Sequence, residues 1–482
     1  VLVGTGLTPY RVHFLRRLLR EIPEVAFHTL NTNHPSAEPW RLPIPFDLDF
    51  EHLDTRARPG RGLSEAAAQW RMGGRVIARL KALEPAAVVV NGYHRTGHLR
   101  VISWCHARGI PLMFASDSNI HADQATGLAR ALKRTIVRSV VRRCDPILVC
   151  GSLGTKYFER YGARAGQCVN VPYEPDYEHL RAIDPARVEQ VRARLRLDPS
   201  RKRLVFCARL AEQKRPDLVV DAFAEVAGDF PNWDLVMAGD GPLREWLLYR
   251  VNTDLLRRVQ FTGFIQDPLD VVALYRSCDV LALSSDWEPW GVVVNEAVAA
   301  GLAVVSTSVV GASAELVRDG VNGRLVPPGN LRLFAQGLRE VMSPGVADAM
   351  KARAPEVLAA WRREADPVEG MREALRRVGV LGGVGSRVGT RAGSPVSSAP
   401  PSLTRARARA QAWQAREEAR PVAFVGGGLT PYRIHLMKRL RSEVRGLHMR
   451  TALTRHPFYE PWKITAVEGF DIDFLDPHPP PR

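Results

Sequence analysis

The chain has 482 residues, of which 45% are hydrophobic, and this length allows two or three buried cores. Its 67 Lys and Arg outnumber its 51 Asp and Glu, which gives a net charge of +16. Residues 382–420 alone supply +5 of this charge, because they contain seven Arg and two Glu. No basic stripe is interleaved with aromatic residues as binding to a nucleic-acid strand requires, so we expect no nucleic-acid partner.

The six cysteines are scattered, without a Cys-x-x-Cys pair or a Cys/His spacing suited to zinc. Their pattern favours a reduced, cytoplasmic protein. The most apolar window, residues 292–310, contains Asn295, Glu296 and Gly301, which indicates a helix and a buried strand rather than a membrane span. Residues 1–3 are strand-like and no Met or signal peptide precedes them, so we expect the start to be truncated.

A glycine turn follows the first strand. Gly6 allows a tight bend, Thr8 suits the N-cap of a helix, and Pro9 suits its first position. We therefore expect the start of this helix, with Tyr10 and Arg11, to point into a cleft.

Short apolar runs alternate with helical patterns along the chain, at residues 86–90, 111–115, 147–150, 204–208, 235–238, 280–283 and 303–306. Such alternation predicts βαβ units and therefore parallel sheets. A charged segment at residues 176–203 interrupts the pattern, so we predict two doubly wound domains on either side of about residue 180. Ligands bind beyond the carboxyl ends of parallel strands, which places the expected site in a cleft between the domains.

Polar residues near the expected cleft in the first half of the chain are His94, His98 and Asp117. Each histidine is either a cleft residue or an ordinary surface residue. Asp117 follows the strand at residues 111–115, where its carboxylate can accept a sugar hydroxyl or orient the acceptor. Capping the next helix is an equal alternative for Asp117.

Four arginines form one basic edge of an amphipathic helix, since Arg130, Arg134, Arg138 and Arg142 recur every four residues. A lipid-linked acceptor on an anionic membrane explains this edge, and would make the protein peripheral to the inner face of a membrane. A solvated helix face explains it as well.

Two cations follow the strand at residues 204–208. Arg209 ends this strand and Lys214 lies in the loop before the next helix. Together they can neutralise a diphosphate and stabilise the charge that builds on a leaving nucleotide. Two solvated loop charges are the alternative.

Two carboxylates follow the strand at residues 280–283. We expect Glu288 in the turn and Glu296 about two turns into the next helix, with amides near Gly291 and Val292 facing the cleft. A carboxylate can accept two vicinal hydroxyls at once, which suits a sugar at Glu288 and a ribose at Glu296. An ordinary turn acid and a surface helix acid are the alternative when each is taken alone.

Residues 284–306 resemble the Glu-x7-Glu signature of family 4 glycosyltransferases, which have the GT-B fold of two doubly wound, Rossmann-like domains facing across a cleft. The cations described above, the Ala-Gly-Asp-Gly-Pro at residues 238–242 and the Phe-Thr-Gly-Phe at residues 261–264 follow the family pattern in the same order. The resemblance implies a retaining transferase that moves a hexose-type sugar from a nucleoside-diphosphate sugar by front-face attack. It implies no cofactor and no required metal ion.

The resemblance also implies roles for individual residues. The candidate catalytic residues are Glu288, Arg209, Lys214 and Asp117. The candidate donor-binding residues are Gly6, Gly263, Phe264, Trp290, Gly291, Val292, Val293 and Glu296. The candidate acceptor-side residues are Tyr10, Arg11 and His94. Asp117 departs from the pattern, because many family members have His at that position.

A block of the first domain recurs at the end of the chain. Residues 6–11 return at 428–433, and the His-Pro and Glu-Pro-Trp of residues 34–40 return at 456–462, both with an offset of 422. We therefore predict an acceptor-side domain at residues 1–180, a nucleotide-sugar donor domain with closing helices at 181–380, a low-complexity linker at 381–420 and a truncated repeat of the first domain at 421–482.

Two other functions stay open. A nucleotide-sugar epimerase has the same fold and needs no acceptor, and an inactive GT-B module would bind only nucleotide or a partner. The residues identify neither the acceptor nor the oligomeric state, and the acceptor is left as a glycan, a lipid-linked glycan or a small molecule.

Overall fold

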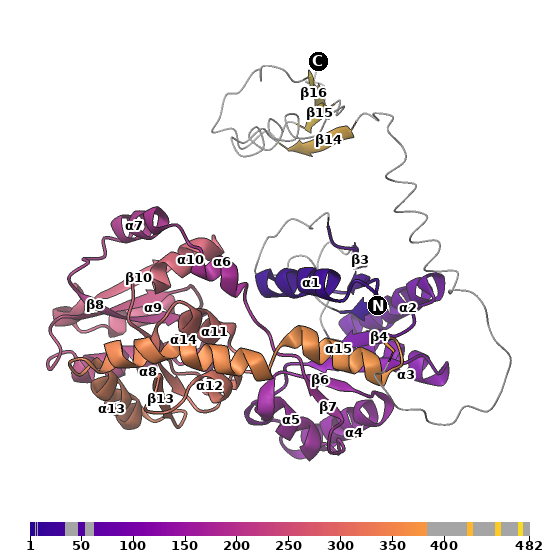
Figure 1. The fold of residues 1–482 in the computed structure, drawn as a ribbon, viewed down its shortest axis with the longest axis horizontal. Helices are drawn as coiled ribbons and strands as arrows, with labels where there is room; N and C mark the ends of the chain where they lie inside the picture. The colour runs from indigo at the N-terminus through magenta and orange to yellow at the C-terminus, as the bar shows by residue number, and fades with distance from the viewer. Residues whose placement is uncertain are drawn as a thin grey trace. The chain divides into compact units, whose positions relative to one another are not determined.

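The computed structural model describes residues 1–382 except 5, 7, 34–46 and 54–61, and beyond them three strands between residues 422 and 475. The chain divides into two compact units, Val1–Gly389 and Thr390–Arg482 (Figure 1). In these described ranges, no helix combines the length and the apolar run that crossing a lipid bilayer requires.

The first sheet of the larger unit has the strand order β3-β2-β1-β4-β5-β6-β7, and all its pairings are parallel. Its strands are β1 (Leu2–Val3), β2 (Thr29–Asn31), β3 (Phe50–His52), β4 (Val88–Asn91), β5 (Leu112–Ser116), β6 (Ile147–Val149) and β7 (Cys168–Asn170). The helices between them are α1 (Pro9–Glu21), α2 (Gly62–Leu83), α3 (Thr96–Ala107), α4 (Gly127–Arg143) and α5 (Gly151–Arg160).

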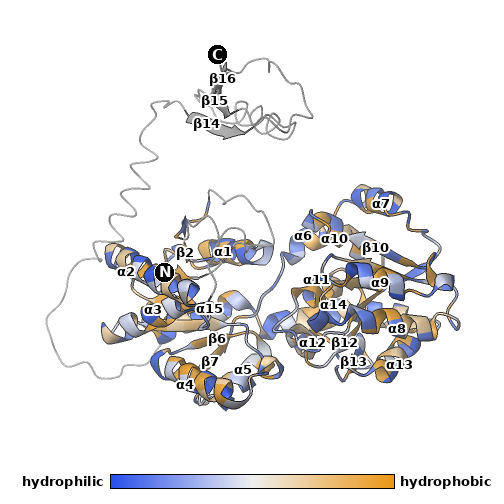
Figure 2. Ribbon diagram, turned by 180° about the vertical axis from the view of Figure 1, so that it is seen from behind, coloured by the Kyte–Doolittle hydropathy of each residue, from blue (hydrophilic) through white to orange (hydrophobic). Residues whose placement is uncertain are grey.

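This sheet buries both faces, because successive residues of a strand point to opposite sides. Val88 and Val90 of β4 pack in the cluster formed with α2, α3, α4 and α5, whereas Val89 between them packs in the cluster formed with α1. Hydrophobic residues alternate with hydrophilic ones along these helices, so each helix keeps a polar side (Figure 2).

The second sheet has the order β10-β9-β8-β11-β12-β13 and is also parallel throughout. Its strands are β8 (Lys202–Cys207), β9 (Trp233–Ala238), β10 (Val259–Gly263), β11 (Val280–Leu283), β12 (Ala303–Thr307) and β13 (Gly323–Val326). The helices of this half are α6 (Tyr177–Arg181), α7 (Pro185–Arg194), α8 (Pro216–Val226), α9 (Arg244–Arg250), α10 (Pro268–Tyr275), α11 (Val292–Ala299), α12 (Gly311–Leu316), α13 (Leu331–Met342), α14 (Val346–Glu364) and α15 (Pro367–Arg377).

Every strand that we placed from the apolar runs is present, as β4, β5, β6, β8, β9, β11 and β12. Strands β2, β7 and β13 had no such prediction, and they are three or four residues long, too short for a clear period-2 pattern. Strand β10, of five residues, had no such prediction either. Both sheets have the order expected of doubly wound domains.

Helix α15 packs on the first sheet, although we assigned residues up to 380 to the second domain (Figure 1). Val368, Met371 and Leu375 lie on one face of α15 and join the cluster around α1. Gly370 permits this approach, since a Cβ there would lie 2.1 Å from the carbonyl oxygen of Asn170 in β7. Helix α15 completes the first domain, because its apolar face packs against α1 and the first sheet.

The chain crosses between the two domains twice, at residues 171–176 and again at residues 365–366. The side chain of Arg17 contacts one carboxylate on each of these two segments. The Arg17 guanidinium of α1 contacts Glu174 on the first crossing and, at 2.7 Å, Asp366 on the second. A third carboxylate, Glu21, lies 2.8 Å away, and Arg17 is only 8% exposed.

The smaller unit contains three parallel strands, β14 (Val422–Gly427), β15 (Met449–Thr454) and β16 (Asp471–Leu475). Phe424 pairs with Thr451 as Leu2 pairs with Thr29, so the pairing of β1 with β2 recurs at the offset of 422. The repeated blocks at 428–433 and 456–462 and most of the predicted linker lie outside the described residues.

Candidate functional site

The loops after β8 and β11 are bonded to each other at the point where the strand order of the second sheet reverses. The Ser284 hydroxyl donates to the carbonyl oxygens of Lys214 (3.1 Å) and Arg215 (2.5 Å). The amide of Asp286 donates to the carbonyl of Gln213 at 3.0 Å. Such a reversal is where open α/β sheets bind ligands, and these bonds hold its two loops in register.

The ammonium of Lys214 forms an ion pair with the carboxylate of Glu288 across these loops. The two side chains are 19% and 12% exposed, and burial lowers the pKa of Lys214 to about 8. The neighbouring carboxylate acts in the opposite direction, because it favours the charged amine. A cation and an anion of low exposure therefore sit side by side, and neither is among the residues that line the cleft described below.

Glycine is needed directly after this turn. Gly291 has φ +88°, and a Cβ there would lie 3.0 Å from Val310 and 3.1 Å from the Glu288 side chain. Gly291 is the N-cap of α11, so the turn that carries Glu288 leads at once into the helix that carries Glu296.

A cleft of about 1180 Å³ lies beside these loops, and residues from both domains line it. Six of the predicted site residues form part of its wall: Tyr10, Arg209, Phe264, Val292, Val293 and Glu296. Arg209 is exposed in this wall and has no ionic or hydrogen-bond partner among the residues that the structure describes. The amides of Val292 and Val293 are the first two of α11, and the first amides of a helix have no partner within it. The wall thus offers a free cation and free amides to one anionic ligand.

Glu296 lies in the second turn of α11. The Tyr275 hydroxyl donates to its carboxylate at 3.3 Å, and burial raises the pKa of Glu296 to about 7. In the cleft, this carboxyl group faces a volume in which a diol can lie.

The turn after β9 packs directly on the end of β8. A Cβ at Gly239 would lie 2.0 Å from the carbonyl oxygen of Ala208, so only glycine fits there. The Gly-Asp-Gly sequence therefore has a structural cause, and Gly239 and Asp240 also line the cleft. Other lining residues carried no signal in the sequence, namely Asp176 and His179 on the crossing segment and α6, and Gln266 after Phe264.

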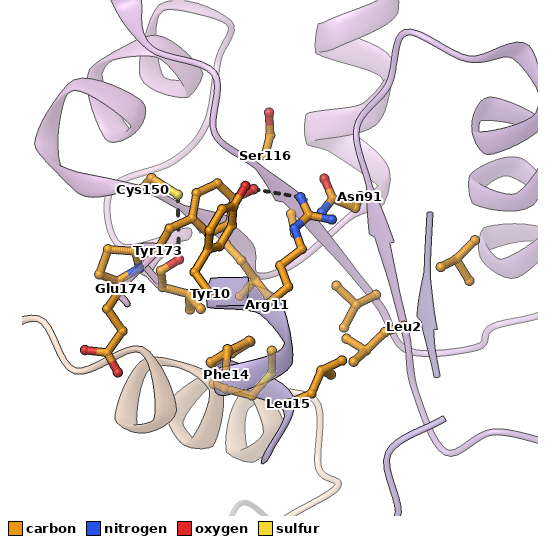
Figure 3. A pocket seen from close by; sticks show the side chains of 17 residues that line it. Leu2, Tyr10, Arg11, Phe14, Leu15, Asn91, Ser116, Cys150, Tyr173 and Glu174 are labelled. Carbon is orange, nitrogen blue, oxygen red and sulfur yellow. Dashed lines mark hydrogen bonds between the residues drawn. The ribbon is translucent and has the colours of Figure 1, made fainter. Parts of the chain in front are cut away.

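On the first domain, Tyr10 and Arg11 begin α1 and line a second, smaller pocket (Figure 3). The Arg11 guanidinium donates to the Tyr173 hydroxyl at 3.1 Å. Tyr10 lines both the pocket and the cleft, which shows that the two volumes adjoin.

Asp117 lies within electrostatic range of Arg11 and of the exposed His94. The alternative that Asp117 caps the next helix is wrong, because that N-cap is Asn119, whose Oδ1 accepts from the His121 amide at 2.7 Å. His98 is not a surface residue, since it is 2% exposed and bonds Thr32 and the Gly92 carbonyl.

Asn119 was not among the predicted site residues, yet its side chain links the two domains by a hydrogen bond to the backbone of Glu288. Its Nδ2 donates to the carbonyl oxygens of Glu288 (3.0 Å) and Val309 (2.9 Å), and the residue is fully buried. A short polar residue before a helix is common, so its contact across the cleft was visible only in three dimensions.

Trp290, predicted in the donor set, is not among the residues that line the cleft. Its side chain is 2% exposed, and the indole N–H donates to the carbonyl of Tyr173 (2.9 Å) and to Oδ1 of Asn295 (3.1 Å). The ring packs at the junction of the domains because its large apolar surface is better buried there. The remaining glycines lie where expected along the chain: Gly6 is buried after β1, and Gly263 ends β10 just before Phe264.

Among the described residues, no group of three or more His, Cys, Asp or Glu is arranged to hold a metal ion. Helix α4 presents its first two turns to solvent, including Arg130 and Arg134, with Leu128 91% and Leu132 64% exposed. Two exposed leucines beside arginines differ from an ordinary solvated face, which is polar.

Comparison with known proteins gives a family match for the second half of this site. Residues 188–356 match the model of the family described as "Glycosyl transferases group 1". The chain is 26% identical over 247 residues to a glycogen synthase of Mycobacterium tuberculosis strain H37Rv, covering 51% of this chain and 57% of the relative. It is 31% identical over 227 residues to a D-inositol 3-phosphate glycosyltransferase of Rhodococcus jostii, covering 45% and 48%. The chain thus spans about half the length of these curated relatives.

Solved structures show the same fold over most of the chain. The structure of HepE from Anabaena in complex with UDP and glucose has a TM-score of 0.60 at 19% identity, covering 79% of this chain and 99% of HepE. WaaG, a glycosyltransferase involved in lipopolysaccharide biosynthesis, has a TM-score of 0.57 at 16% identity, covering 80% and 99%. Residues 188–356 are therefore a glycosyltransferase group 1 domain, within a chain that has the GT-B fold.

Proposed function

We propose that the chain is a retaining glycosyltransferase of family 4, which moves a hexose from a nucleoside-diphosphate sugar to an acceptor. One observation carries the proposal: Arg209, the first amides of α11 and Glu296 line one cleft, beside the Lys214–Glu288 ion pair. A cation and helix amides suit a diphosphate, and a carboxylate suits the ribose diol. The names of similar proteins agree, since HepE is described with UDP-glucose and a mycobacterial relative as GDP-mannose-dependent.

In the proposed reaction, the bond between the anomeric carbon and the donor's phosphate oxygen breaks while an acceptor hydroxyl attacks from the same face. The departing phosphate oxygen takes the proton of that hydroxyl, so sugar, proton and nucleoside diphosphate are all accounted for. Arg209, Lys214 and the α11 amides stabilise the charge on the departing diphosphate, mainly in the transition state. In this proposal Glu288 holds hydroxyls of the transferred sugar and Asp117 orients the acceptor.

The first test is a thermal-shift screen of the intact chain with UDP-, GDP- and ADP-sugars, followed by an assay of nucleoside-diphosphate release. We expect one nucleotide class to stabilise the protein and Glu288→Ala to lose turnover while the chain stays folded, with a lower unfolding temperature because Lys214 loses its buried partner. Glu212→Gln is the matched control, because Glu212 is exposed on the same loop as Lys214. If Glu288→Ala and Lys214→Ala both keep full activity, the assignment is wrong.

Product analysis separates transfer from epimerisation. A transferase releases nucleoside diphosphate only with a hydroxyl to receive the sugar, whereas an epimerase changes the sugar in the absence of any acceptor. NMR of the products also shows whether the anomeric configuration is retained, and an inactive module yields no product in either assay.

We also propose that residues 421–482 repeat the first domain and that the first turns of α4 contact anionic lipid. The shared offset of the sequence blocks and of the β14–β15 pairing supports the repeat. The exposed Leu128 and Leu132 beside arginines support the lipid contact.

A further inference from the structure

A small apolar pocket enters the first domain beside the cleft. It measures about 70 Å³ and is enclosed by α1, α15, the strands of the first sheet and the first crossing segment (Figure 3). Most of its lining is hydrocarbon, from Leu2, Phe14, Leu15, Val89, Leu148 and Met371. Tyr10 lines both volumes, so a ligand in this pocket lies against a side chain that also borders the cleft.

Arg11 supplies the charge at this pocket. Its guanidinium carries five N–H donors and uses one of them, to the neutral Tyr173 hydroxyl at 3.1 Å, among the described residues. No carboxylate of the described chain forms an ion pair with it, and Asp117 acts only at longer range. Glu174 also lines the pocket, but its carboxylate contacts Arg17.

The other arginines of α1 all contact carboxylates, unlike Arg11. Arg16 pairs with Asp47 at 2.7 Å, Arg20 pairs with Glu21 at 2.7 Å, and Arg17 contacts three carboxylates. Within the described part of the chain, Arg11 is the arginine of this helix without a paired carboxylate, and it lines an apolar pocket. A cation removed from water without an anion is costly, so the site is suited to a ligand that brings one.

We propose that this pocket binds the acceptor, and that the acceptor is a small molecule in which an oxyanion is joined to a compact apolar group. The oxyanion, a phosphate ester or a carboxylate, binds Arg11; the apolar group fills the space between Leu15, Val89 and Met371; the hydroxyl that receives the sugar lies near Tyr10. A cavity of roughly 150 Å³ accepts benzene, so a pocket half that size takes a short alkyl group. This inference rests on the proposed transfer reaction.

The test measures binding to the intact chain without donor, by calorimetry or ligand-observed NMR, with n-butyl phosphate, inorganic phosphate, n-butanol and n-butyltrimethylammonium. We expect butyl phosphate to bind at least tenfold more tightly than inorganic phosphate and than butanol, and the ammonium ion not to bind. Equal affinity of butyl phosphate and inorganic phosphate would overturn the apolar part of the site. Equal affinity of butyl phosphate and butanol would overturn the role of Arg11.

Three substitutions locate the binding. Arg11→Met should weaken butyl phosphate at least tenfold and leave butanol unchanged, whereas Arg16→Met, on the same helix but half-exposed, should change neither. Arg209→Met should also leave butyl phosphate unchanged; if it abolishes binding instead, the ligand is in the donor site and the proposal fails. The ligand series on the unmodified chain decides the question even if Arg11→Met does not fold.

The acceptor role has its own readout. A phosphate ester whose hydroxyl lies next to the phosphate and whose butyl group is free to enter the pocket, 2-hydroxyhexyl phosphate, should stimulate nucleoside-diphosphate release from the donor that the thermal screen selects. Arg11→Met should raise its KM rather than lower kcat. If butyl phosphate binds at Arg11 while this compound leaves release unchanged, the acceptor assignment is overturned. A failure of the proposed transferase function is distinguishable from a failure of this inference, because the donor screen measures nucleotide-sugar binding and involves neither Arg11 nor the pocket.

Discussion

The two sheets meet the cleft with different chemistry. At the edge of the second sheet, Lys214, Glu288, Arg209 and Glu296 come from two loops and one helix that are bonded to one another. At the edge of the first sheet, Arg11 is a lone cation at an apolar pocket. Under the proposed function, the donor half, formed by the second sheet, is thus prepared for a highly charged ligand. The acceptor half, formed by the first sheet, is completed by a ligand that supplies an anion to Arg11.

The largest effect that we expect in the donor half comes from Lys214→Met. Loss of its charge removes stabilisation of the leaving diphosphate, so kcat should fall about 10³-fold, on the order of 4 kcal/mol. Steady-state kinetics measure this fall, and Glu212→Gln should keep normal kcat. A tenfold or smaller loss of kcat would mean that Arg209 and the α11 amides stabilise the leaving diphosphate without Lys214. The two halves would then differ less in their charged groups than we infer.

The next effect concerns the connection between the halves. Arg17→Met leaves Glu174, which is 2% exposed, without its cation, and should lower the free energy of unfolding by about 3 kcal/mol. Arg20→Met is the matched control, because Arg20 is largely exposed and its pair with Glu21 contributes about 0.5 kcal/mol. Urea unfolding gives both values; equal losses would show that the crossing segments do not depend on Arg17.

The smallest effect is a pH dependence of nucleoside binding at Glu296. Its pKa of about 7 means that the group is protonated below pH 7, and ribose hydroxyls need the ionised form as acceptor. The affinity for the nucleoside should therefore fall about tenfold between pH 8 and pH 6, because each unit below the pKa costs up to a factor of ten. The nucleoside lacks a diphosphate, so Lys214 does not contribute.

Titration calorimetry at pH 6, 7 and 8 measures this change. Glu296→Gln should bind more weakly and show no slope over the same range, since the amide does not titrate. A slope that persists in this variant would assign the proton to another group of the cleft.

The positions of the charged residues after β8 and β11 could be predicted from the sequence, because they lie in short motifs directly after strands. Glu288 and Glu296 are eight residues apart, and Arg209 and Lys214 are five apart, so strand ends fix their positions with little help from the rest of the chain. The burial of Trp290 in the same motif could not be predicted, because the bonds of its indole N–H to Tyr173 and Asn295 depend on how the domains pack.

The acceptor half was much less predictable. Its pocket combines residues from β1, α1, four further strand ends and α15, and Arg11 meets Tyr173 across 162 positions of the chain. Asn119 contacts Glu288 across 169 positions. No local pattern carries such pairings, because they depend on how two domains and a returning helix pack.

The return of α15 makes the first domain discontinuous along the chain, and this matters during synthesis. Its sheet is complete at Asn170, but the helix that covers Leu2, Met113 and Leu148 begins at Pro367. At about 5–20 residues per second, the intervening stretch takes roughly 10–40 s to be made. For that time the nascent first domain carries an uncovered apolar face, and the ribosome-bound chain reaches its final fold only after the whole donor domain has emerged.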